Sequence, residues 1–392
     1  MKASFRDLFF FISGVTLTCL FFSIQYNELF HPRTVTQDMY QMRDYHRLLR
    51  NDQPLQQLST DQPTDQPTGL PSDDCTCKSA TSGKLYDFCY KNPHYSELIG
   101  KKFECTSLVH LENMKLVDSP GPFQDLKEKT RNETDEVFVT ALDDKHLVEG
   151  TNELKTIRKY YPNQKIIIYG LNLSKTNKDK LTKEYPGVEM RDFDYSKYPK
   201  MVENLMEYRF KPLIVAEVLK EYTNVWWADA HVALSKPEIK STLYKEIAEG
   251  FVEKKNPINS SILFLSYANH SNFAVLFPKL LHYFPQPDLN ILASKKVGEQ
   301  LGANFIYFAR TPSTNELVKW WVLCALDKEC MAPNGAQLKC NYSLNMYTDF
   351  MGCYRYDQSV INLLLMNEHK NHKKFLGSVD RFSYKFFQYG NY

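Results

Sequence analysis

EVFVTALDDKHLVEGTNELKTIRKYYPNQKIIIYG, residues 136–170, is the stretch that decides the fold. It opens and closes with short apolar runs, 136–141 and 165–169, which have the length and composition of buried strands. Between them, residues 146–160 carry apolar side chains at helical spacing and stop before Pro162. Strand, helix and strand in this order predict two parallel strands joined by a helical crossover.

The same alternation continues to about residue 365 and predicts an α/β domain over residues 131–392. We expect a Rossmann-like, mixed and mostly parallel sheet flanked by helices. Ligands of such sheets bind beyond the carboxyl ends of the strands. The further predicted strands are 188–190, 224–228, 262–266 and 304–308, and the further predicted helices are 178–184, 212–222, 316–326 and 358–365.

The N-terminal part of the chain predicts a membrane anchor followed by a stem. Residues 8–24 carry no charge and, as a helix, would span about 25 Å, the short end of the transmembrane range. Lys2 and Arg6 in the preceding tail, residues 1–7, favour a cytosolic N-terminus and a lumenal body in the Golgi or ER membrane. A cleaved signal peptide is the alternative, but no A-x-A-like site follows. Residues 25–74 are polar, repeat Asp-Gln-Pro, and predict a flexible stem.

Cysteines and glycosylation sequons agree with a lumenal body. Eight of the nine cysteines follow the apolar run, four before the α/β pattern and four near its end, so disulfides within each group are the simplest arrangement. Zinc binding is the alternative for the first group. Residues 75–130, which hold that group, form either a small stapled subdomain or an ordered lead-in. The cysteines are Cys75, Cys77, Cys89, Cys105, Cys324, Cys330, Cys340 and Cys353, and the predicted N-glycosylation sites are Asn132, Asn172, Asn259, Asn269 and Asn341.

Asp229 and His231 follow the predicted strand 224–228 in the stretch VWWADAHVAL, residues 225–234. If the strand continues through them, positions two apart point to one side, so the carboxylate and the imidazole project together. Such a pair can ligate one divalent cation and leave open positions for substrate oxygens. A structural strand end is the other interpretation, and the D-x-H spacing alone favours it.

The wider stretch RFKPLIVAEVLKEYTNVWWADAHVAL, residues 209–234, resembles the core of the GT-A nucleotide-diphospho-sugar transferases. It is similar in particular to a poorly characterised group abundant in nematodes, with F-K-P-x-x-(I/V)-x-E-x-L followed by W-W-x-D-A-H, and more remotely to glycogenin-like enzymes. FVTALDDKHLVEG (138–150), TIRKYYPNQKIIIYGLNLS (156–174) and YRYDQSVINLLL (354–365) extend the resemblance over roughly 134–370. Anchor, stem and lumenal domain are also the usual layout of Golgi glycosyltransferases.

The resemblance implies roles for individual residues. Asp229 corresponds to the first carboxylate of the D-x-D metal motif, and His231 stands where the second carboxylate normally lies, which implies Mn²⁺ at a site with one negative charge fewer. Lys211 corresponds to a basic residue near the donor, where its ammonium would hold the diphosphate; otherwise it is a solvated helix start. Thr140 and Asp143 follow the first strand, where these folds place the nucleoside, although Asp143 can instead cap the next helix.

The last predicted helix adds two candidates. Asp357 and Gln358 open it, where the resembling folds place an Asp and a Gln against the sugar and the acceptor, so both are candidate catalytic residues; an Asp at a helix start is otherwise a cap. His369 and His372 lie in the region that supplies a metal-binding histidine in glycogenin-like enzymes, without the surrounding motif.

These features together predict a membrane-anchored lumenal glycosyltransferase with a nucleotide-sugar donor and a glycan or protein acceptor. A catalytically inactive relative that binds or scaffolds is the alternative, favoured by the missing second carboxylate. A metal hydrolase is a third interpretation, but the His/Asp clusters of two-metal sites are lacking. The net charge of +2, from 48 basic and 46 acidic residues, gives no reason to expect a nucleic-acid partner.

Overall fold

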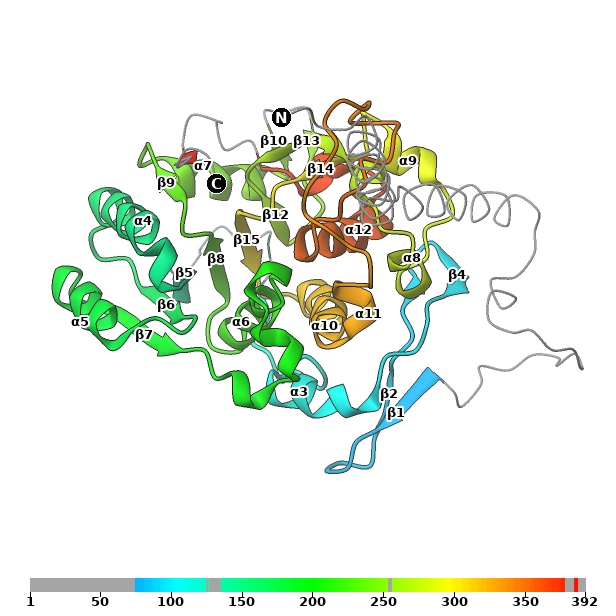
Figure 1. The fold of residues 1–392 in the computed structure, drawn as a ribbon, viewed down its shortest axis with the longest axis horizontal. Coiled ribbons are helices and arrows are strands. Elements are labelled where there is room, and N and C mark those ends of the chain that lie inside the picture. Colours follow the sequence, from blue (N-terminus) through cyan, green and yellow to red (C-terminus); the bar gives the residue numbers. More distant parts are fainter. Residues whose placement is uncertain (1–74, 125, 127–134, 253–255, 378–383, 387–392) are drawn as a thin grey trace, which may run out of the picture. The chain divides into compact units, whose positions relative to one another are not determined.

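The computed structural model describes residues 75–124, 126, 135–252, 256–377 and 384–386 (Figure 1). The predicted cytosolic tail, anchor and stem, residues 1–74, lie outside these ranges, as does the sequon at Asn132. Within the described ranges, no helix has both the length and the apolarity to cross a membrane.

A six-stranded sheet forms the centre of the domain (Figure 1). Its strands are β5 (Glu136–Leu142), β6 (Ile166–Gly170), β7 (Val188–Asp192), β8 (Asn224–Ala228), β12 (Ile262–Phe264) and β15 (Phe305–Ala309). They lie in the order β12–β15–β8–β5–β6–β7, in which β8, β5, β6 and β7 are parallel and β15 is antiparallel to both of its neighbours. The predicted mixed, mostly parallel sheet is therefore confirmed.

The central strands form from continuous apolar runs. All residues of β6 (IIIYG), β8 (NVWWA) and β15 (FIYFA) are buried, as expected of strands that helices cover on both faces. Trp226 and Trp227 point to opposite faces, since neighbouring strand residues alternate. Trp226 stacks on Phe138 with the ring centroids 5.5 Å apart. Both tryptophans are core residues, as the sequence predicts.

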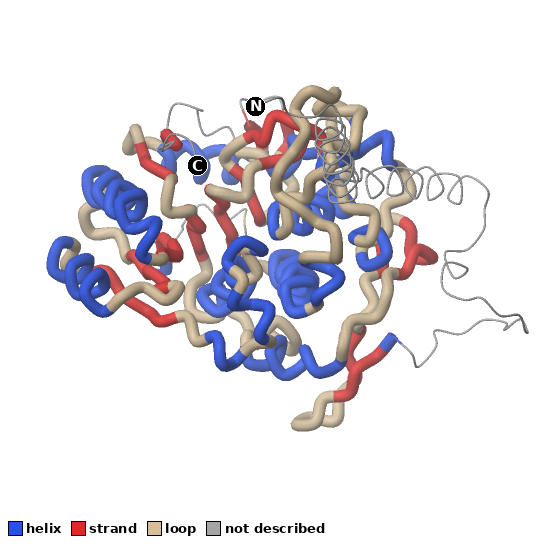
Figure 2. The backbone as a smooth tube through the Cα atoms, viewed as in Figure 1, coloured by secondary structure: helices blue, strands red, loops and turns tan. Residues whose placement is uncertain are grey.

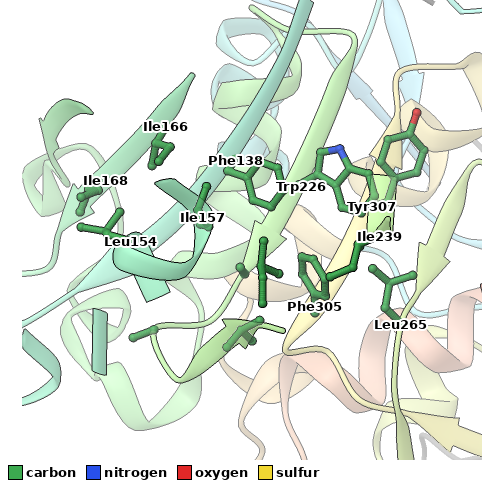
Figure 3. Packing of buried hydrophobic residues seen from close by; sticks show 14 of the residues in the cluster. Phe138, Leu154, Ile157, Ile166, Ile168, Trp226, Ile239, Leu265, Phe305 and Tyr307 are labelled. Carbon is green, nitrogen blue, oxygen red and sulfur yellow. The ribbon is translucent and has the colours of Figure 1, made fainter. Parts of the chain in front are cut away.

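Helices flank the sheet on both faces (Figure 2). One face is covered by α4 (Leu147–Tyr160), α5 (Lys175–Glu184) and α7 (Ile239–Glu249), whose apolar side chains form one core with the strands. In Figure 3, Leu154 and Ile157 of α4 lie against Ile166 and Ile168. The other face carries α6 (Phe210–Leu219), α10 (Pro312–Leu326) and α12 (Asp357–His369), which pack on one another.

Residues 75–116 form an ordered lead-in that packs on this body. Tyr90 meets Trp320 of α10 edge-on, with the ring centroids 5.5 Å apart, and Phe103 lies 5.9 Å from the ring of Phe284. The lead-in therefore shares its core with the domain, which favours the lead-in over a separate stapled subdomain. Its elements are β1 (Thr76–Lys78), β2 (Leu85–Asp87), β3 (Lys91–Asn92), β4 (Tyr95–Ile99), η3 (Cys105–Ser107) and α3 (Leu108–Asn113).

All four disulfide bonds join cysteines of the same sequence group, as predicted. The pairs are Cys75–Cys89, Cys77–Cys105, Cys324–Cys330 and Cys340–Cys353. Zinc binding by the first group is therefore wrong, because all four of its thiols are bonded.

Short elements make up the rest of the domain. Two of them border the site described below: β9 (Val232–Leu234), which pairs with β16 (Tyr384–Phe386), and β14 (Glu299–Leu301), which pairs with β13 (Tyr267–Ser271). The others are β10 (Phe251–Val252), β11 (Asn256–Pro257), α8 (Leu280–Tyr283), α9 (Leu289–Ala293), α11 (Lys328–Met331), and the 3₁₀ turns η5 (Asp144–His146), η6 (Tyr195–Lys197), η7 (Lys200–Glu203), η8 (Leu205–Glu207), η9 (Phe273–Val275) and η10 (His372–Phe375).

Candidate active site

Lys211, Asp229 and Asp357 meet at the carboxyl end of β8. They come from the first turn of α6, the residue after β8, and the first residue of α12. The chain adds β6 and β7 on one side of β5 and then crosses to add β8 on the other. The carboxyl ends of β5 and β8 thus form the topological switch point, where open α/β sheets bind ligands.

Lys211 lies at the centre of this group. Its Nζ is surrounded by three oxygens: Asp229 Oδ1 at 3.0 Å, Asp357 Oδ2 at 3.1 Å and the Ala303 carbonyl at 2.9 Å. The side chain is only 3% exposed. Burial lowers the pKa of Lys211, but the charges of Asp229 and Asp357 outweigh burial and raise it above its usual value. The ammonium therefore stays charged, with a hydrogen bond to the Ala303 carbonyl and ion pairs with the two carboxylates.

The local sequence explains how Lys211 enters the site. Tyr208, three residues earlier, has a left-handed backbone with φ 52°, which turns the chain into α6. Pro212 follows in the first turn of the helix, where a missing N–H is tolerated. Arg209 is fully buried and holds the start of α6 by donating to the carbonyls of Ala325, Asp327 and Lys328, at the junction of α10 and α11.

Asp357 is the buried carboxyl of the group, with a side chain 5% exposed. Burial raises its pKa to about 6; Lys211 lowers the pKa, and the nearby charge of Asp229 raises it. Tyr356 directly before it has φ 43° and ψ −116°, a strained conformation for a residue with a side chain. Strain of this kind is typical of functional sites and here precedes the residue that faces Lys211.

Asp229 is fixed through its backbone and its side chain. Its N–H donates to the Asn304 carbonyl at 2.7 Å, and its Oδ1 accepts from Trp227 Nε1 at 2.7 Å. The strand ends at Ala228, and the N–H of Val232 returns to the Asp229 carbonyl at 2.8 Å, which closes a turn. The prediction that Asp229 and His231 share one face of a continuing strand is therefore wrong.

A Mn²⁺ site at Asp229 and His231 stays a prediction. His231 lies half-buried in the turn and interacts with another group of the protein. Across the residues described, no three His, Cys, Asp or Glu side chains are grouped to hold a metal ion. At an effective dielectric constant of about 20, a divalent ion about 4 Å from the Lys211 ammonium would be repelled by about 8 kcal/mol, and each ionised carboxylate at that distance would attract it by about as much. An ion between Asp229 and Asp357 would therefore compete with the Lys211 ammonium for the same carboxylate oxygens.

Gln358, a predicted catalytic residue, has its amide engaged in holding the neighbouring segment. Its Nε2 donates to Gln300 Oε1 at 2.6 Å, and its Oε1 accepts from the Ala303 N–H at 3.1 Å. Asn362, one turn further along α12, binds both the N–H and the carbonyl of Leu301, each at 2.9 Å. Segment 301–304 is thereby fixed by α12, and its carbonyls contact Lys211 and the backbone of Asp229.

The two predicted nucleoside contacts lie at the end of β5, in different settings. Thr140 is buried within β5. Asp143 caps η5: its carboxylate accepts from the His146 N–H at 3.0 Å and pairs with the His146 ring at 2.6 Å. The capping alternative for Asp143 is thus what the structure shows, and a nucleoside contact by either residue stays a prediction.

Glu153 of α4 is a buried acid near the site that the sequence-based prediction missed. It is 1% exposed, and no group within the described residues meets either carboxylate oxygen in full hydrogen-bond geometry. Burial raises its pKa well above the usual value; the Thr140 hydroxyl lowers the pKa, and Asp229 raises it. Gly150 lets α4 approach β5, since a Cβ there would lie 2.5 Å from Leu142. An acid inside the apolar stripe of a helix was the available signal.

The remaining predicted residues fall into two groups. Asn172, Asn259, Asn269 and Asn341 are exposed, as an attached oligosaccharide requires, and their glycosylation stays a prediction. His369 and His372 are buried, and burial lowers the pKa of each to about 4. Neither joins a metal-binding group among the described residues.

Comparisons with known proteins give a family model and weak structural likenesses. Residues 75–216 match a family described as a protein of unknown function, DUF1647. No curated protein matches the chain.

Among solved structures, the chain is similar to the mannosyltransferase Ktr4p from S. cerevisiae, with 12% identity over 56% of this chain and 71% of that one and a TM-score of 0.32. It is also similar to core-mannan synthase A (CmsA/Ktr4) from Aspergillus fumigatus in its Mn/GDP form, with 11% identity, 75% and 83% coverage and a TM-score of 0.37. The galactosyltransferase LgtC, in complex with donor and acceptor sugar analogues, gives 14% identity, 58% and 70% coverage and a TM-score of 0.29. Likenesses of this size carry neither an activity nor a metal over to this chain.

Proposed function

We propose that the chain is a glycosyltransferase, which moves a sugar from a nucleotide-diphosphate donor to a hydroxyl of a glycan or protein. The observation that carries the proposal is the pair of carboxylates, Asp229 and Asp357, bridged by Lys211 at the switch point of the sheet. The sequence resemblance of residues 134–370 to the GT-A transferases supports the same reaction class.

The charges of the site suit this reaction. Breaking the bond between the anomeric carbon and the phosphate oxygen leaves positive charge on the sugar ring, as in other glycosyl transfers. With both carboxyls ionised, the group carries one net negative charge, which would stabilise a positively charged ring held beside it. Asp229, with 23% of its side chain exposed, is the member that a ligand reaches, whereas Asp357 lies beneath the surface.

In this proposal the reaction takes place in the lumen of the Golgi or ER. Residues 8–24 would anchor the chain as a single-pass, type II membrane protein, with residues 25–74 as the stem. Four disulfide bonds support an oxidising compartment.

The test uses the purified full-length protein and a panel of nucleotide sugars, with release of the nucleoside diphosphate as the readout, because slow donor hydrolysis identifies nucleotide and sugar together. Calorimetry with the free nucleoside diphosphates measures binding separately. Asp229→Ala should abolish hydrolysis. Replacing Asp118, an exposed carboxylate that follows the lead-in and pairs with Lys84, by Ala should leave it unchanged.

If no nucleotide binds and no donor is hydrolysed, with or without added metal, the transferase proposal is wrong. The second candidate, a binding or scaffolding protein that keeps the fold, would then take its place. One observation favours that candidate: His231 stands where the related motif has a second carboxylate.

A further inference from the structure

We infer that the Lys211 ammonium is the resident cation of this site and fills the position between Asp229 and Asp357 that a divalent metal ion would otherwise occupy. The inference rests on the proposed function and adds that nucleotide binding here does not depend on added metal. It concerns this chain's own residues, so it can be tested with the metal alone.

The oxygens around Lys211 Nζ are those that a hard cation prefers. Two carboxylates and one backbone carbonyl converge on a single point, at 3.0, 3.1 and 2.9 Å. Ca²⁺, Mg²⁺ and Mn²⁺ favour this oxygen chemistry, but Ca²⁺ and Mg²⁺ bind at about 2.0–2.6 Å. The observed distances are instead those of charge-assisted contacts to an ammonium. The cluster therefore has the donors of a metal site and the spacing of a lysine site.

Three features keep the ammonium in this position. The side chain is 3% exposed, so the ammonium would have to leave its oxygens to reach solvent. The Nζ lies 5.5 Å from the ring centroid of Trp227 and 5.7 Å from that of Tyr208, within the range of cation–π attraction. The backbone of Lys211 belongs to α6, whose start is clamped by Arg209. Unlike a metal ion, this cation is covalently attached and cannot be removed by a chelator.

The segment that supplies the carbonyl is held in place on both sides. The Ala303 carbonyl accepts from Lys211, and the Ala303 N–H is held by Gln358 of α12. The Asn304 carbonyl accepts from the N–H of Asp229. A Cβ on Gly302, the preceding residue, would lie 2.6 Å from Ser266 Oγ, so the loop packs tightly where it meets the cluster.

The first experiment titrates MnCl₂ alone into the full-length protein at near-neutral pH, followed by calorimetry and by the electron paramagnetic resonance signal of free Mn²⁺. We expect no specific site in the wild type. Lys211→Ala leaves two carboxylates and a carbonyl around the vacated position, so it should gain one Mn²⁺ site, at least about tenfold tighter than any wild-type binding. Adding Asp357→Asn should remove the gain.

Lys240→Ala is the matched control. Lys240 is also largely buried and bridges two oxygens, Glu136 Oε1 at 2.8 Å and Gln164 Oε1 at 2.9 Å, but only one belongs to a carboxylate. This variant should gain no Mn²⁺ site. The second experiment compares the affinities for UDP and GDP in excess EDTA and in excess MnCl₂, and we expect them to differ by less than about twofold.

A wild-type protein that binds one Mn²⁺ and loses it on Asp229→Asn would overturn the inference, as would a nucleotide affinity that rises about tenfold or more with Mn²⁺. A folded Lys211→Ala variant without a new Mn²⁺ site would also overturn it. If that variant does not fold, the wild-type titration decides. If neither nucleotide binds in either condition, the proposed function fails, while the titration with Mn²⁺ alone still tests the resident cation.

Discussion

Asp357→Asn should change the pH dependence of stability in a defined direction. Burial raises the pKa of Asp357 from its usual 3.8 to about 6, against the opposing effect of Lys211. A carboxyl whose pKa is raised by folding stabilises the fold fully below its unfolded pKa, and this contribution is lost as the pH rises through the folded pKa. A difference of about two pH units corresponds to at most about 3 kcal/mol, at about 1.4 kcal/mol per unit.

The assay is guanidinium unfolding of the wild type and Asp357→Asn with the disulfides intact, followed by tryptophan fluorescence from about pH 4 to about pH 8. The free energy of unfolding of the variant minus that of the wild type should rise by about 2–3 kcal/mol between about pH 4 and about pH 7. Titrating groups that do not interact with Asp357 cancel in the difference.

Glu189→Gln provides a control of opposite sign. A hydrogen bond from Lys165 lowers the pKa of Glu189, burial opposes this and raises it, and Arg191 lowers it further, so the net shift is downward. Its stabilisation is therefore present above the unfolded pKa and is lost as the pH falls, so the variant-minus-wild-type difference should decrease with pH. A flat difference for Asp357→Asn, or one that falls with pH, would refute the buried ion-pair geometry from which the magnitude is worked.

Three further changes test the support of the site. Arg209→Met should lower the free energy of unfolding by about 3 kcal/mol or more, because three carbonyls at the junction of α10 and α11 lose a charged donor. Arg209→Lys should not restore the stability, since one ammonium cannot replace the planar guanidinium. Replacing Cys324 and Cys330 by Ala should lower the same quantity by about 2 kcal/mol, since the disulfide closes a short loop with a sequence separation of 6. Trp227→Phe removes the indole donor to Asp229 and should weaken nucleotide binding about tenfold in calorimetry, with unfolding changed by less than about 1.5 kcal/mol.

The regular elements could be predicted where hydrophobic periodicity is strong, and their starts were missed where capping sets the boundary. The helix predicted over 316–326 begins at Pro312, because Thr311 caps it by accepting from the Thr314 N–H and proline suits the first turn. The first turn of this helix is polar, so the spacing of apolar residues gives no helix signal there. The helix predicted from residue 178 likewise begins at Lys175, after Ser174 caps it.

The members of the site could be predicted one by one, but not their arrangement. Lys211, Asp229 and Asp357 each belong to a separate motif, and nothing in the spacing of the motifs says that the three side chains meet. The third oxygen around Lys211 is the backbone carbonyl of Ala303, and a carbonyl has no sequence signature. Gln358 was predicted to face substrate, because its place in the motif does not reveal that its amide accepts from the Ala303 N–H.

The turn after β8 shows why the D-x-H spacing misleads. Positions two apart share a face only if the strand continues through His231. The pairing of β8 with β15 ends at Ala228, which lies opposite Phe305, the first residue of β15. Asp229 then gives its N–H to the Asn304 carbonyl and receives the N–H of Val232 on its own carbonyl, so His231 occupies a turn and not a strand position. Asp229 thus acquires its cationic partner from α6 and not from two residues downstream. In this site the neighbour that matters for the first carboxylate is Lys211, and Asp357 of α12 completes the pair that shares it.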